Sequence, residues 1–295
     1  TGVSETVSRK RIFTCRPTSA SDQAACASSI VRGLSTQAFR RPPTDSELTR
    51  LLRFYDAGKT ETFEHGITKA VEAILASPQF LFRLEDTPAT ARPGQPYRLA
   101  DGELASRLSY FIWGAAPDEA LQVLATEGRL SAPAALDRQV ARLLADPRAE
   151  ALSTRFASQW LRLQDLDDVS PDPILYPYYD RTLAEALQQE TELFVASLVR
   201  EDRSVLDLLT ADYTFANERV ARHYGIGGVT GNRFRRVALP AERRGILGHG
   251  SVLTLTSIAD RTSPVQRGKW IMEVLLGSPP PAPPPNVPAL EETRG

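Results

Sequence analysis

The sequence has few of the residues that mark metal, haem and disulfide-rich proteins. Only two cysteines and three histidines occur among its 295 residues. No pair of cysteines has CxxC spacing, and the CxxCH motif of attached c-type haem is missing. The metalloprotease motif HExxH, the phosphate-binding loop and the nucleophile elbow are missing too. We therefore expect no metal site and no cofactor held by this chain.

The sequence also lacks an excess of either charge and any long apolar run. It has 35 basic and 36 acidic residues, so no basic surface for nucleic acid is expected. No apolar run reaches the roughly 20 residues that cross a bilayer, so we expect no transmembrane segment. The first residues, TGVSETVSRKR, have no apolar centre and are no signal peptide. From both ends, we expect the sequence to be part of a longer protein.

The two cysteines, Cys15 and Cys26, lie close together in the sequence. We favour a disulfide between them, which would tie the N-terminal arm to the first expected helix. It would also indicate an oxidising compartment, periplasmic or extracellular. The alternative is a pair of reduced, buried thiols acting as small apolar side chains.

Apolar residues recur at helical spacing along most of the chain, which predicts an all-α fold. We expect some twelve helices in two packed subdomains. A Thr44-x-x-Glu47 pattern predicts a capping box at one helix start. Residues 86–98, DTPATARPGQPYR, contain three prolines and a glycine and indicate a boundary or a long connection.

A small β element is expected near residues 230–258. Residues 229–240 and 251–258 each have a weak strand-like pattern. After them, residues 279–285 read PPPAPPP, which predicts an extended polyproline segment.

Polar and aromatic side chains gather in residues 211–226, ADYTFANERVARHYGI. Asp212, Asn217 and His223 are its candidate catalytic residues, because general acid–base chemistry needs a positioned histidine and a carboxylate. Glu190 is a fourth candidate, since it borders the apolar stripe of a long helix. Its preferred interpretation is a buried salt bridge to an arginine; the alternative is a carboxylate with a raised pKa or a metal ligand.

A second candidate site involves Arg261, Ser263 and Arg267. Ser263 and Pro264 predict a helix start, and its free N–H groups together with the two arginines would suit an anion. The preferred alternative is that the arginines pair with Asp260 or Glu273.

The loop at residues 165–179 contains four aspartates, Asp165, Asp167, Asp168 and Asp172, which could bind calcium. The loop lacks the glycine and the terminal glutamate of an EF-hand, so a solvated acidic loop is the preferred interpretation.

Several stretches together resemble a bacterial family across nearly the whole chain. They include AFRRPPTDSEL, ILASPQFLFRLE, LADGELASRLSYFIW, ETELFVASLVREDRSVLDLLTADYTFANERVARHYGI and LTLTSIADRTSPVQRGKWIMEVLLGSPPPAPPPNVP. They resemble cytochrome-associated proteins of planctomycetes, myxobacteria and acidobacteria that carry the domains DUF1595, DUF1592 and DUF1588. The resemblance implies such domains at residues 1–85, 86–228 and 229–295, in that order.

The resemblance also implies an exported protein with c-type haem or cytochrome-like regions outside this sequence. Within the chain, His65, His223 and His249 are candidates to face such a haem, and the alternative is three packed or exposed helix histidines. Two function classes follow. The first is a non-catalytic structural or partner region of a cytochrome c-associated protein, with a cytochrome-like domain or complex subunits as protein partners. The second is an extracytoplasmic enzyme domain, redox or hydrolytic, with a polar site around His223.

Overall fold

The computed structural model describes residues 6–281. The chain divides into two compact units, Thr1–Ala149 and Glu150–Gly295. Most described residues are helical, and one small antiparallel sheet lies in the second unit. The prediction of a helical protein with a small β element is confirmed at that level.

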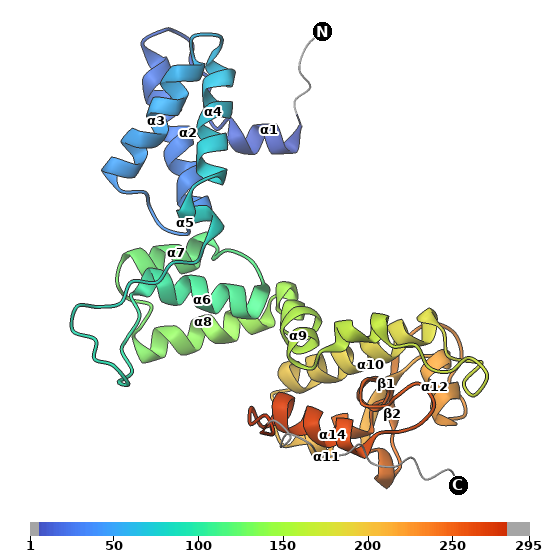
Figure 1. Ribbon diagram of the computed structural model, residues 1–295. Coiled ribbons are helices and arrows are strands. Elements are labelled where there is room, and N and C mark those ends of the chain that lie inside the picture. The colour runs from blue at the N-terminus through green and yellow to red at the C-terminus, as the bar shows by residue number, and fades with distance from the viewer. Residues whose placement is uncertain (1–5, 282–295) are drawn as a thin grey trace. The chain divides into compact units, whose positions relative to one another are not determined.

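Three helices lie side by side in the first unit, α2 (Asp22–Phe39), α3 (Asp45–Gly58) and α4 (Phe63–Leu75) (Figure 1). The predicted capping box is present: Thr44 Oγ1 accepts from Glu47 N at 3.2 Å, and Glu47 Oε2 accepts from Thr44 N at 2.8 Å. These bonds satisfy two N–H groups that a helix start leaves open. The apolar side chains of the three helices form one core, which includes Ile30, Val31, Leu51, Tyr55, Ile67 and Ile74.

A disulfide joins Cys15 to Cys26, as predicted, with the two Cα atoms 5.9 Å apart. It attaches the arm that carries α1 (Val7–Ile12) to α2. Ile12 and Phe13 of the arm pack on the core of the three helices, and Arg9 forms an ion pair with Glu64 of α4. The arm is therefore held by a covalent bond, apolar contacts and a charge pair.

Replacing both cysteines, as Cys15→Ala/Cys26→Ala, should lower the free energy of unfolding of this three-helix region by about 3 kcal/mol. The bond closes a loop whose ends are 11 residues apart, so its loss frees the unfolded chain. Hydrogen exchange of the α2–α4 amides measures the change. Reducing the unaltered protein should give the same loss, and finding two titratable thiols before reduction would contradict the bond.

The rest of the first unit begins with the short helix α5 (Pro78–Leu81) and the proline-rich connection. Three further helices follow, α6 (Asp101–Trp113), α7 (Glu119–Thr126) and α8 (Pro133–Ala145). Asp118 caps α7 by accepting from Leu121 N at 3.1 Å, and its carboxylate binds Arg142 of α8. Trp113 Nε1 of α6 donates to the Leu143 carbonyl of α8 at 2.9 Å, so polar contacts join α8 to both α6 and α7.

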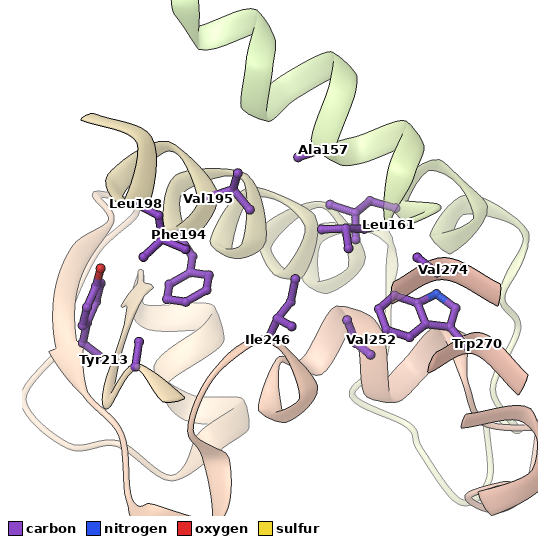
Figure 2. Packing of buried hydrophobic residues seen from close by; sticks show 12 residues of the cluster. Ala157, Leu161, Phe194, Val195, Leu198, Tyr213, Ile246, Val252, Trp270 and Val274 are labelled. Atoms are coloured by element: carbon purple, nitrogen blue, oxygen red, sulfur yellow. The ribbon is translucent and has the colours of Figure 1, made fainter. Parts of the chain in front are cut away.

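The second unit is built around α10 (Arg181–Arg200), whose N-cap is Asp180. Figure 2 shows side chains of α10 packed with residues from distant segments. Phe194 is fully buried and lies in this cluster, whose members include Leu161, Tyr213, Ile246, Val252, Trp270 and Val274. The remaining α-helices of the unit are α9 (Ser158–Trp160), α11 (Asp207–Thr210), α12 (Glu218–Tyr224), α13 (Gly250–Leu255) and α14 (Pro264–Trp270).

The sheet differs in part from the prediction. Strand β2 (Arg235–Ala238) lies in the expected region, but its partner is β1 (Tyr213–Ala216), in register Tyr213↔Ala238. The second expected strand, residues 251–258, is instead largely helix α13. A short apolar run suits either structure, and burial of Ser251 and Val252 against α10 favours the helix here.

A second difference concerns the segment after Pro147, where the spacing of Leu152, Phe156, Trp160 and Leu163 predicts one continuous helix. The chain forms a 3₁₀ turn, a π-helical segment (Leu152–Ala157), the short α9 and a further 3₁₀ segment (Leu163–Asp168). A second π-helical segment, Ile271–Leu275, follows α14, and Trp160 Nε1 donates to its Val274 carbonyl at 2.8 Å. This hydrogen bond between distant residues holds the indole ring of Trp160 in place. The spacing of apolar residues in the sequence does not reveal it.

No helix within residues 6–281 is both long and apolar enough to cross a membrane. The polyproline segment lies mostly outside the described residues, so its conformation stays a prediction.

Candidate functional site

Helix α10 carries a fully buried carboxylate, Glu190. Thr214 Oγ1 of β1 donates to Glu190 Oε1 at 2.7 Å, and the Tyr224 hydroxyl of α12 donates to Oε2 at 2.5 Å. The Tyr224 oxygen in turn accepts from Gly250 N at 2.6 Å. One carboxylate therefore connects α10, β1, α12 and the start of α13.

The salt bridge preferred for Glu190 is not found. Among the described residues no arginine or lysine lies within ion-pair distance of its carboxylate, and its partners are hydroxyl groups. Burial raises the pKa of Glu190 to about 7, while the two hydroxyl bonds and the charge of Arg243 act in the opposite direction. The alternative interpretation, a carboxylate with a raised pKa, is the one that the geometry supports.

A second buried polar group lies beside the first, since Thr191 follows Glu190 on α10. Thr191 Oγ1 lies 3.0 Å from His249 Nδ1 and 2.7 Å from Ser251 Oγ. All three side chains are buried, and the ring of Phe194 meets the His249 ring edge-on, with the centroids 4.8 Å apart. Burial lowers the pKa of His249 to about 3, so its imidazole is neutral at neutral pH.

Glu190→Gln should remove the pH-dependent contribution that Glu190 makes to the free energy of unfolding. The folded pKa of about 7 lies above the ordinary 4.5, so between these values the folded chain keeps a proton that the unfolded chain releases. Raising the pH from 4.5 to 7 therefore lowers the free energy of unfolding, by about 3 kcal/mol from this group, and the contribution is lost as the pH rises.

The measurement is chemical denaturation at pH 4.5 and pH 8 for the parent chain and the variant. Glu185→Gln, on an exposed part of the same helix, controls for the loss of one negative charge. If the parent and Glu190→Gln show the same pH dependence, the raised pKa of Glu190 is refuted.

Of the other candidates in residues 211–226, His223 lies beside the cluster, with its ring centroid 5.5 Å from that of Tyr224, whereas Asn217 and Asp212 have other positions. Asn217 caps α12, where its Oδ1 accepts from Val220 N at 3.0 Å. Asp212 is exposed and directly precedes β1. His223 is half-buried, with its ring centroid 6.1 Å from that of Tyr178. Burial, followed by the charges of Arg243 and Arg219, lowers the pKa of His223.

The predicted anion site is only partly assembled. Ser263 caps α14, because its Oγ accepts from Gln266 N at 3.3 Å. Arg261 pairs with Asp260 at 3.0 Å, which is the preferred alternative. Arg267 donates to Thr256 Oγ1 at 3.2 Å, whereas Glu273 pairs with Arg162 and Lys269. The geometry thus gives each of these groups a structural contact.

The acidic loop does not gather its carboxylates. Asp172 Oδ1 accepts from the backbone N–H of Ile174, 2.7 Å away, which stabilises a turn. In residues 6–281 no set of three His, Cys, Asp or Glu side chains is arranged to hold a metal ion.

His65, another of the histidines that could face a haem, lies in the first unit near the start of α4. Its Nδ1 is 3.6 Å from Glu61 Oε2.

Three family models match the chain in order. A model for DUF1595 (PSD5) matches residues 26–85, one for DUF1592 (PSD4) residues 99–226 and one for DUF1588 (PSCyt3) residues 243–295, each described as a protein of unknown function. This chain carries DUF1595, DUF1592 and DUF1588 domains. Searches of curated proteins and of solved structures found no match.

The buried polar cluster joins two of these domains. Glu190, Thr214 and Tyr224 lie in the DUF1592 match, whereas His249, Gly250 and Ser251 lie in the DUF1588 match. The bond from Gly250 N to Tyr224 and the contacts of Thr191 with His249 and Ser251 link the two segments in one core. In the second unit, therefore, the DUF1588 segment completes the core of DUF1592.

Sequence reasoning missed Thr214, Tyr224, His249 and Ser251 as partners in this cluster. Tyr224 lies in the polar and aromatic stretch at residues 211–226, but its partner Glu190 is 34 residues earlier in the chain. The signal available was Gly250: a Cβ there would lie 2.5 Å from Leu187 Cδ2 and 3.1 Å from the Tyr224 hydroxyl. A glycine beside a polar run can mark such a close approach of segments.

The cluster can hold and release a proton, because the pKa of Glu190 lies near neutrality. It has no exposed face at Glu190, His249 or Ser251, all of which are fully buried. A substrate would have to displace packed core residues to reach them. The arrangement is therefore suited to holding the DUF1592 and DUF1588 segments together.

Proposed function

We propose that this chain is a non-catalytic structural or partner region of an exported, cytochrome c-associated protein or complex. The observation that carries the proposal is the burial of Glu190, whose carboxylate is held by two hydroxyl groups inside the core. A catalytic carboxylate needs access to substrate. Of the other candidates, Asn217 caps a helix, Asp212 is exposed and Arg261 pairs with Asp260.

The exported location is supported by the Cys15–Cys26 disulfide, since such bonds persist mainly in oxidising compartments. The cytochrome association is supported by the name of the DUF1588 model, PSCyt3. On this proposal the haem is held by a partner or by a flanking region of a longer protein, and this chain holds none.

The test is the absorption spectrum of the native full-length protein, purified with its bound partners from the cell envelope. We expect a c-type haem spectrum that stays with the protein through purification, and a protein without free thiols. A haem-free preparation recovered from the cytoplasm with two reactive thiols would contradict the proposal.

A second candidate function is an enzyme domain with a polar site around His223. Its supporting observation is that the half-buried imidazole has a lowered pKa, caused by burial and by Arg243 and Arg219. A neutral imidazole at neutral pH can accept a proton. NMR titration of His223 tests this: a pKa below 6.5 that shifts on addition of a substrate analogue favours the enzyme, and a pKa at the ordinary value removes its basis.

A further inference from the structure

A groove of about 540 Å³ lies in the first unit, whereas the buried polar cluster belongs to the second. Residues from the end of α2, from α5 and the connection after it, and from α6 and α7 line it. A second hollow of about 410 Å³ shares Arg83, Leu84, Glu103 and Ser106 with the groove. Phe39, Phe82 and Leu84 give the groove apolar walls, a common feature of small-molecule sites.

Arg40 is a buried cation in the wall of this groove, with 8 % of its surface exposed. Its guanidinium donates to the backbone carbonyls of Gln79 at 2.7 Å and Phe82 at 2.8 Å. No carboxylate among residues 6–281 lies within ion-pair distance of it. Carbonyl dipoles satisfy its N–H groups but leave its full positive charge, and buried charges are rarely left unpaired.

Arg83 places a second positive charge beside Arg40. The Arg83 guanidinium lies 4.7 Å from the centre of the Tyr110 ring, and that of Arg40 lies 5.9 Å from the same centre. Arg83 is exposed, and no acidic side chain in the described part of the chain pairs with it. Two cations on one ring repel each other, and the ring offsets only part of that cost.

Glu103 and Arg41, two other charged residues that line the groove, already have partners. Glu103 is already engaged, because its carboxylate accepts from Asp86 N at 2.5 Å and Ala100 N at 3.2 Å. Arg41 pairs with Glu47 at 2.8 Å. Its pKa is raised mainly by Glu47 and also by the negative charge of Asp86.

We propose that this groove binds a small-molecule oxyanion, a carboxylate or phosphate group carried on an apolar body. Arg83 donates hydrogen bonds to the oxyanion, because its N–H groups are not committed to other side chains. Arg40 supplies charge from within the wall, and Phe82 and Leu84 contact the apolar body. The site lies in the DUF1595 match and the start of the DUF1592 match, and it does not depend on the cytochrome association.

Isothermal titration of the whole chain tests the site with phenyl phosphate, benzoate and the neutral compound benzyl alcohol. We expect binding of at least one anion and none of benzyl alcohol, with the stronger anion showing whether phosphate or carboxylate is preferred. Arg83→Gln should weaken anion binding about ten-fold or more, since hydrogen bonds to charged groups are among the stronger ones.

Arg138→Gln is the matched control, because Arg138 is an exposed arginine on α8 outside the groove. It should leave anion binding unchanged. Chemical shifts of the Tyr110 ring should move with the anion in the parent chain. The proposal is overturned if neither anion binds, if benzyl alcohol binds equally well, or if Arg83→Gln and Arg138→Gln have the same effect. Arg83 is exposed, so its variant should fold even if Arg40→Gln does not.

Discussion

Gly245→Ala is expected to lower the free energy of unfolding of the second unit by about 3 kcal/mol or more. Gly245 has φ of 63° and ψ of −175°, a backbone conformation nearly confined to glycine, which costs a residue with a Cβ about 1–3 kcal/mol. A Cβ there would also lie 2.4 Å from the carbonyl carbon and oxygen of Leu209. Backbone atoms cannot rotate away as a side chain can, so the segment before β1 would have to move.

Gly231→Ala separates the two causes. Gly231 has φ of 77°, but a Cβ there meets no heavy atom within 4 Å. This variant should cost only about 1 kcal/mol. Hydrogen exchange of the α10 amides measures both values. Equal losses for the two variants would show that the close approach to Leu209 does not exist.

Leu187→Ala should be similarly damaging, with a loss of about 2–5 kcal/mol. Leu187 has no exposed surface, and it packs beneath the polar cluster beside Gly250. Truncation leaves a cavity between α10 and α13, and it removes the packing that keeps water from Glu190. The variant should therefore also bring the pKa of Glu190 down from about 7.

Leu206→Ala is the matched control, since the same side chain is 67 % exposed there. It should change stability by less than about 0.5 kcal/mol. Chemical denaturation of both variants gives the comparison. A small effect of Leu187→Ala would mean that α10 and α13 are not packed as the structure has them.

Local signals in the sequence predicted the local structure well. Thr44 and Ser263 each cap a helix, because a cap depends only on the few residues that follow it. The pairing of Cys15 with Cys26 was also accessible, since no other cysteine is present.

Contacts between distant segments could not be read in the same way. The partner of β2 is β1, and nothing in either short strand specifies the other. For Glu190, the sequence shows a carboxylate near an apolar stripe but not what neutralises it. Many arginines made a salt bridge the natural expectation, whereas the fold supplies Thr214 and Tyr224. The candidate site residues are grouped in the sequence by residue type alone. Their positions depend on tertiary packing, which does not bring all of them together.

An NMR titration of the Glu190 carboxyl carbon in the whole chain tests the sealed core most directly. We expect a pKa of about 7, and a higher pKa in Tyr224→Phe, which removes one of the two hydroxyl donors that lower it. A pKa near 4.5 that does not respond to Tyr224→Phe would place this carboxylate in water. That result would contradict the sealed core on which the non-catalytic function is argued.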